Sequence, residues 1–114
     1  MRDSDYDLIK LEATEEGLAV VTLNRPDVHN AFNAELIAEL TDAFQTIADQ
    51  RTVRMMILRG AGKKTFAAGG DLRELAGLRT EAEAETMALG AKAAFNAIRD
   101  FPVPVVAALN GSAF

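Results

Sequence analysis

The chain contains no cysteine and no tryptophan, and it has a single histidine, His29, among its 114 residues. The absence of cysteine excludes a disulfide scaffold, a thiolate nucleophile and any metal site built on cysteine. One histidine leaves neither a histidine pair for a metal ion nor a spare histidine for a serine triad. We therefore expect no resident metal ion.

Long basic runs and long apolar runs are also missing. Lys and Arg total 12 against 17 Asp and Glu, a formal net charge of −5, so binding to nucleic acid or to an anionic membrane is not expected. No apolar run approaches transmembrane length, and residues 1–7 are acidic and polar, unlike a secretory signal. We expect a cytoplasmic or organelle-matrix protein. The composition, 49% hydrophobic and 25% charged, is typical of one globular domain over residues 1–114.

Four segments have the pattern of β-strands. Residues 7–13 alternate between apolar and polar positions, residues 18–23 are expected to form a second strand, and the short turn between them predicts a hairpin. Residues 53–58 are apolar on both faces, as in a buried parallel strand. Residues 105–109 are expected to form a last buried strand.

Helical patterns lie between these strands. Asn30 or Asn33 can cap a helix that runs to about residue 49, and a short helical pattern covers residues 71–76. Thr80 and Glu83 form a capping-box pattern before another helix. That helix is expected to bury Met87, Ala91, Ala94, Phe95 and Ile98 and to stop before residues 101–104. The order β-β-α-β-loop-α-β indicates the α/β class.

Residues 66–72, Phe-Ala-Ala-Gly-Gly-Asp-Leu, form the most informative segment. They join a strand pattern to a short helical pattern, and two adjacent glycines allow a sharp turn with uncovered backbone N–H groups. Such amides at the start of a helix favour a negative oxygen, either of a phosphate or of an oxyanion. By itself this is a weak signal, because many loops contain a glycine pair.

Each polar residue near this segment has a structural and a functional interpretation. Asp71 suits a helix N-cap better than a general base, and Glu74 suits a solvated helix position better than an acyl pocket. His29 is more typical of an exposed loop than of a catalyst. Lys63 and Lys64 are ordinary loop cations unless a phosphate lies nearby.

Four segments in this order resemble the crotonase, or enoyl-CoA hydratase/isomerase, superfamily. They are residues 20–26 with 30–33, residues 53–60, residues 66–72, which are similar to the family's F-x-A-G-x-D-L/I, and residues 104–111, which are similar to its P-V-I-A-A-V-N-G. Their order and spacing agree with the family over nearly all 114 residues. The resemblance implies a spiral of β-β-α units, of which this chain is expected to be the N-terminal portion, and chemistry on acyl-CoA thioesters.

The resemblance also assigns roles to particular positions. Gly70 matches a residue whose backbone N–H holds the thioester oxygen as it becomes an oxyanion, and Ala68 matches one whose backbone meets the adenine of CoA. The CoA-binding set that it implies is Arg25, Ala67, Ala68, Gly69, Asp71 and Arg73, and Leu72 and Leu75 are expected near the acyl chain, where Leu75 and Leu78 also suit a plain core role. No cofactor is implied apart from coenzyme A as part of the substrate. Family members commonly form trimers or dimers of trimers, so a homo-oligomer is expected.

Some of the family's machinery is not expected within these residues. By family spacing, the second oxyanion donor falls about two residues beyond Phe114, and the glutamates that act as general acid and base come later still, so the 114 residues alone are expected to be inactive. Enoyl-CoA hydratase is the leading reading, while isomerase and 3-hydroxyacyl-CoA hydrolase activities share this half. The alternative classes are a non-catalytic fragment or split subunit and, with low weight, a generic phosphate-binding module. The family's basic residue after Arg-Pro is also missing, since residues 27–29 are Asp, Val and His.

Overall fold

A hairpin begins the fold in the computed structural model, which describes residues 6–113. Strand β1 (Ile9–Ala13) pairs antiparallel with β2 (Leu18–Leu23), with Leu11 opposite Val21. Leu11 and Val21 are both buried, so the alternating pattern places one face of the hairpin in the core. The predicted hairpin is confirmed.

The hairpin is extended into a sheet of four strands in the order β1-β2-β3-β5. Strand β3 (Met55–Gly60) runs parallel to β2, and β5 (Val105–Ala108) runs parallel to β3. In this register Val21 lies beside Leu58, and Leu58 lies beside Ala107. The predicted parallel pairing of the third strand is therefore confirmed.

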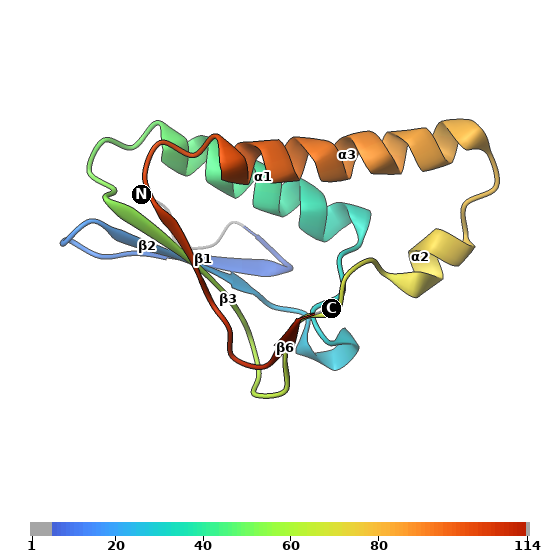
Figure 1. Cartoon of the computed structure of the whole chain (residues 1–114), viewed down its shortest axis with the longest axis horizontal. Coiled ribbons are helices and arrows are strands. Elements are labelled where there is room, and N and C mark those ends of the chain that lie inside the picture. Colours follow the sequence, from blue (N-terminus) through green and yellow to red (C-terminus); the bar gives the residue numbers. More distant parts are fainter. Residues whose placement is uncertain (1–5, 114) are drawn as a thin grey trace.

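Two long helices cover one face of this sheet, side by side (Figure 1). Helix α1 (Ala34–Ala48) is capped by Asn33, whose side chain accepts from the Leu36 N–H, and α3 (Glu81–Arg99) is capped by Thr80. The cap of α1 is thus Asn33 and not Asn30. The core between helices and sheet contains Ile9, Leu11, Val21, Leu23, Leu36, Leu40, Phe44, Ile47 and Met56.

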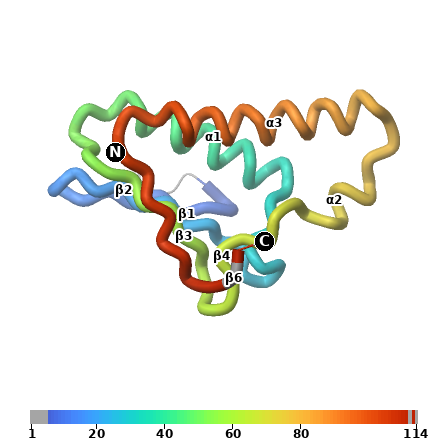
Figure 2. Tube along the Cα trace, in the orientation of Figure 1, coloured from blue at the N-terminus to red at the C-terminus, as the bar shows by residue number. Residues whose placement is uncertain are grey.

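A second, smaller sheet lies beyond the carboxyl end of β3. Strand β4 (Thr65–Ala67) pairs parallel with β6 (Ser112–Ala113), and neither strand was predicted from the sequence. Helix α2 (Leu72–Ala76) follows β4, and a single 3-10 turn, η1 (Pro26–Val28), follows β2. The chain trace shows α2 standing away from the main sheet, below the N-terminal half of α3 (Figure 2).

Three burial predictions are wrong. Strand β3 is not buried on both faces, because Met55 is 39% exposed and Ile57 and Leu58 are half-buried. The last strand of the main sheet, β5, is an edge strand whose residues are mostly exposed, and Leu109 after it is 65% exposed. In α3 only Ala94 is fully buried, Met87, Ala91 and Ile98 are half-buried, and Phe95 is 60% exposed. Ile98 and Val105 pack against the core cluster, whereas the exposed side chains of Phe95 and Leu109 are not part of it.

Within residues 6–113, none of the helices is long and apolar enough to cross a membrane.

Candidate active site

The segment predicted from its glycine pair links strand β4 to helix α2. Ala67 is buried in the strand, Ala68 and Gly69 are half-buried, and Gly70 is exposed. Gly69 has φ +84°, a left-handed conformation that a side chain rarely adopts, so the turn requires a glycine there. Strand β4 of the small sheet ends at Ala67, and the chain passes through Gly70 into α2, whose cap is Asp71.

The backbone of Phe32 holds this turn in place. The Phe32 N–H donates to the Gly69 carbonyl at 2.7 Å, and the Asp71 N–H donates to the Phe32 carbonyl at 2.9 Å. These two bonds make a parallel bridge between Phe32 and Gly70. In such a bridge the central residue turns its own N–H away from the partner strand.

The Gly70 N–H is consequently available to a ligand. Among residues 6–113 it has no hydrogen-bond acceptor, and the residue is exposed. A Cβ placed on Gly70 would lie 3.2 Å from Cδ1 of Leu75, so the Leu75 side chain forms one wall beside this amide. An exposed, oriented N–H next to an apolar side chain can donate to an oxygen that gains negative charge.

Asp71 is fixed by bonds to both of its carboxylate oxygens. Its Oδ1 accepts from the N–H groups of Arg73, at 2.9 Å, and Glu74, at 3.3 Å, which caps α2. Its Oδ2 accepts a hydrogen bond from Nη1 of Arg25 at 3.1 Å. The Arg25 side chain is 15% exposed and the Asp71 side chain 14%. The Glu74 N–H lowers the pKa of Asp71 most, partial desolvation opposes it, and Arg25 lowers it further.

The cap prediction for Asp71 is therefore confirmed, and the alternative role as a general base loses support. A base must accept a proton, whereas these bonds stabilise the ionised carboxylate. Arg25 also donates to the Ala31 carbonyl at 2.7 Å. Its guanidinium therefore serves as a tie between the loop after β2 and α2.

Glu74 has a structural contact that its sequence position did not indicate. Its Oε1 accepts from the Ala34 N–H at 2.8 Å, so the carboxylate lies at the N-terminus of α1. A carboxylate is favoured there by the unpaired amides of the first turn. Glu74 is half-buried and is not the solvated residue that was expected.

A groove of about 720 Å³ lies between α1, α2 and α3. Small and apolar residues dominate its lining, which includes Ala34, Ile37, Ala38, Leu78, Ala82, Met87, Gly90 and Ala93, with Glu74 and Glu83 among its polar members. The volume is in the range that accommodates a small-molecule ligand. Leu78 lines this groove, whereas Leu75 is 45% exposed and Leu72 is 80% exposed, so neither belongs to the core among the described residues.

The remaining predicted CoA contacts are spread around the segment. Ala68, Gly69 and Gly70 lie together with Arg25 and Asp71, while Arg73 is exposed on α2. These CoA contacts stay predictions.

A smaller cavity of about 250 Å³ lies behind the segment, beside the loop after β2. Its lining includes His29, Lys63, Lys64 and Thr65. The Nδ1 of His29 lies 3.2 Å from Oγ1 of Thr65, and His29 is an exposed residue. The expected loop position of His29 is confirmed.

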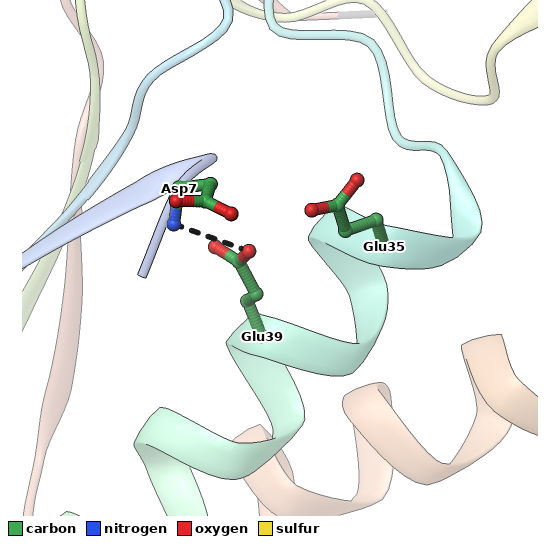
Figure 3. A group of neighbouring side chains, drawn as sticks. All are labelled: Asp7, Glu35 and Glu39. Atoms are coloured by element: carbon green, nitrogen blue, oxygen red, sulfur yellow. Dashed lines mark hydrogen bonds between the residues drawn. The ribbon is translucent and has the colours of Figure 1, made fainter. Parts of the chain in front are cut away.

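Three carboxylates, of Asp7, Glu35 and Glu39, gather at the start of β1 and along α1 (Figure 3). Glu39 already accepts the N–H groups of Asp7, at 3.2 Å, and Leu8, at 2.8 Å. Its carboxylate thereby ties the start of the hairpin to α1. Asp7 and Glu35 are exposed, so water solvates their charges.

Comparison with known proteins gives one family. Residues 13–114 match the family model described as enoyl-CoA hydratase/isomerase. The chain is 40% identical over 108 residues to the crotonyl-CoA hydratase of Syntrophomonas wolfei. This alignment covers 95% of this chain and 41% of that protein. The chain spans about two fifths of the length of the curated relatives it matches.

Solved structures show the same fold. A Magnetospirillum magneticum enoyl-CoA hydratase/carnithine racemase aligns with a TM-score of 0.83 and 41% identity, over 90% of this chain and 39% of that one. The enoyl-CoA hydratase of Bacillus anthracis aligns with a TM-score of 0.86 and 30% identity, over 92% of this chain and 40% of that one. The expected α/β architecture is thus confirmed.

Proposed function

Because the chain belongs to the enoyl-CoA hydratase/isomerase family, we propose that it supplies the thioester-binding part of an enzyme that adds water to a 2-enoyl-CoA. The Gly70 N–H, exposed and without an acceptor among residues 6–113, is the observation that carries this proposal. The reaction needs no resident cofactor, since coenzyme A enters as part of the substrate.

The proposed role of Gly70 follows from where charge develops. When the oxygen of water bonds to the β-carbon of the enoyl group, the water gives up one of its protons and the electron pair of the double bond moves toward the carbonyl, whose oxygen becomes the enolate oxygen. The α-carbon then takes up a proton. An N–H that is already oriented stabilises this oxygen without reorganisation at the moment of reaction.

Ligand contacts are proposed on both sides of this amide. Ala68 and Gly69 have little or no side chain, so a flat ligand such as adenine can approach their backbone. Arg25, Ala67, Asp71 and Arg73 complete the proposed CoA-binding set, in which the ionised Asp71 acts through the position of α2 and Arg73 offers an exposed charge for a phosphate.

The acyl chain is proposed to lie on the α2 side of Gly70. Leu75 stands directly against this glycine, and Leu72 and Leu78 extend the apolar surface, with Leu78 facing the groove between the helices. Burial of each methylene of an acyl chain in such a groove contributes about 0.8 kcal/mol. Assembly into a trimer, or a dimer of trimers, is part of the proposal.

Hydration of crotonyl-CoA by the full-length enzyme, monitored through the decrease in enoyl thioester absorbance, tests the reaction, and every activity measurement uses that full-length enzyme. Binding of a saturated analogue, butyryl-CoA, measured by calorimetry, tests the site without chemistry. Isomerase and 3-hydroxyacyl-CoA hydrolase activities use the same oxyanion and are assayed in parallel. If the protein showed no binding and none of these activities, the proposal would be contradicted. That result would favour a non-catalytic module that folds against a partner.

A further inference from the structure

Asn30 is a fully buried polar residue with every side-chain group engaged. It has a left-handed conformation, φ +55°, which asparagine tolerates better than most residues. Its Oδ1 accepts from the Arg25 N–H at 2.8 Å. Its Nδ2 lies 3.1 Å from each of three carbonyl oxygens, those of Ala61, Thr65 and Phe66. The side-chain amide of Asn30 thus forms hydrogen bonds at both ends of the loop between β3 and β4.

Asn110 engages the same loop from the opposite end of the chain. Its Oδ1 accepts from the Gly60 N–H at 3.1 Å. Its Nδ2 donates to the carbonyls of Gly62, at 2.9 Å, and Thr65, at 3.2 Å. The Thr65 carbonyl is therefore the shared acceptor of both asparagine side chains.

Two glycines make this convergence possible. A Cβ on Gly60 would clash with the Phe66 carbonyl oxygen and lie 2.9 Å from Nδ2 of Asn30. A Cβ on Gly111 would clash with the backbone of Lys64. The backbone segments consequently approach more closely than side chains would allow, which brings both amides within bonding distance.

The acceptor that they share lies at the start of β4, the strand that leads directly into Gly70. Thr65 is the first residue of β4, and Ala67 is its last. The other side of the turn is held by Phe32, two residues after Asn30. A displacement of Thr65 along the strand would therefore move Gly70 relative to Phe32.

We infer that Asn30 and Asn110 are positioning residues that hold the Thr65 carbonyl and so set the direction of the Gly70 N–H. This inference rests on the proposed function of Gly70. The two amides act through the backbone and do not touch the substrate. Their loss should lower kcat on the order of 10- to 100-fold, as small misplacements of catalytic groups do, with little change in KM.

The primary test uses Asn110→Ala and Asn110→Asp, because Asn110 is only half-buried and its replacement leaves the core intact. Asp retains the acceptor for the Gly60 N–H but has no donor for Thr65. The value of kcat should therefore fall by a similar factor in both variants. Asn30→Gly, which keeps the left-handed backbone, and the double variant Asn30→Gly/Asn110→Ala complete a double-mutant cycle, in which a shared acceptor predicts non-additive effects.

Two spectroscopic readouts separate positioning from simple loss of stability. The carbonyl ¹³C resonance of bound [1-¹³C]crotonyl-CoA reports polarisation of the thioester and should move toward its value in water in each variant. The ¹H–¹⁵N resonance of Gly70 should shift even without substrate. Thr14→Ala, which removes a side-chain acceptor of the distant β1–β2 turn, should lower Tm and leave both signals unchanged.

The outcomes are distinct. If Asn110→Ala lowers Tm as Thr14→Ala does but leaves kcat, the ¹³C shift and the Gly70 resonance unchanged, the inference is overturned. If the unaltered protein neither binds nor converts thioesters, the proposed function fails. The Gly70 resonance then still decides whether the two asparagines position this amide.

Discussion

Nη1 of Arg25 lies 3.1 Å from Oδ2 of Asp71 and joins the loop after β2 to the cap of α2, 46 positions further along the chain. The same nitrogen donates to the Ala31 carbonyl, so one guanidinium holds the loop after β2 and the cap of α2 together beside the Gly69–Gly70 turn. Helix α2 buries none of its own residues. Its position therefore depends on polar ties such as this one and the bond from Ala34 to Glu74.

We predict that Arg25→Gln loosens α2 without unfolding the protein. The neutral amide is shorter and cannot hold the Ala31 carbonyl and the Asp71 carboxylate together. Backbone amides of residues 72–77 should exchange several-fold faster in hydrogen-exchange mass spectrometry, while those of β2 and α1 keep their rates. Arg99→Gln is the matched control. The side chains of the Arg99–Asp100 pair are 72% and 68% exposed, so this ion pair contributes little to stability. Equal exchange in both variants would contradict the prediction.

The lowered pKa of Asp71 predicts a pH dependence of stability. Its folded-state pKa lies below the ordinary value of 3.8, so the unfolded chain binds the proton more readily than the folded one. The stabilisation is present above the unfolded-state pKa and is lost as the pH falls through the folded-state pKa. Tm of the protein and of Asp71→Asn should therefore converge below about pH 3.8. A Tm difference that stays constant from neutral to acidic pH would show that the charge of Asp71 contributes nothing.

Phe44 is one of the largest fully buried side chains of the core, so we predict that truncating it causes a large loss of stability. It is 1% exposed, and its ring meets that of Phe101 edge to face, with centroids 5.3 Å apart and planes at 74°. Phe44→Ala should lower the free energy of unfolding by about 3–5 kcal/mol in urea denaturation. Phe95→Ala is the matched control on α3, where an exposed ring should change stability by less than about 0.5 kcal/mol. Similar losses at both positions would mean that Phe95 is covered in solution.

Local patterns predicted the main elements because each carried its own physical signal. The alternation in β1 and the apolar stripe of α1 are periodic, and Asn33, Asp71 and Thr80 are side chains suited to capping. Strands β4 and β6 were missed because three and two residues are too short to show a period. Their pairing joins residues that lie 47 positions apart, Thr65 and Ser112.

The sequence located the turn of the candidate site but not the contacts that hold this turn in place. The glycine pair gave a turn with free amides, and the four ordered segments gave the resemblance, but neither indicated what holds the turn. The Phe32 bridge, the Glu74 bond to Ala34 and the Asn110 bonds all connect segments that are distant in the sequence. Asn30 illustrates the limit, since an asparagine before a helix signals a cap or a loop tie equally, and only tertiary structure distinguishes them.

Gly70→Pro tests the amide on which the proposed function depends. Proline removes the N–H and leaves the carbonyl, so a substrate that still binds would lose one donor to its oxyanion. Loss of one such donor lowers kcat by about 100- to 1,000-fold, which we expect for crotonyl-CoA hydration. Butyryl-CoA binding should weaken far less, because the donor matters most where charge has developed.

Gly70→Ala is the matched control for this change. It keeps the N–H, and its Cβ would meet only the flexible end of Leu75, which can adjust by a few tenths of an ångström. Activity should stay within about an order of magnitude of the unaltered protein, while circular dichroism confirms that both variants are folded. If Gly70→Pro keeps its kcat in a folded protein, the oxyanion is held elsewhere. If both variants lose activity equally, the space beside Leu75, and not the N–H, governs the reaction.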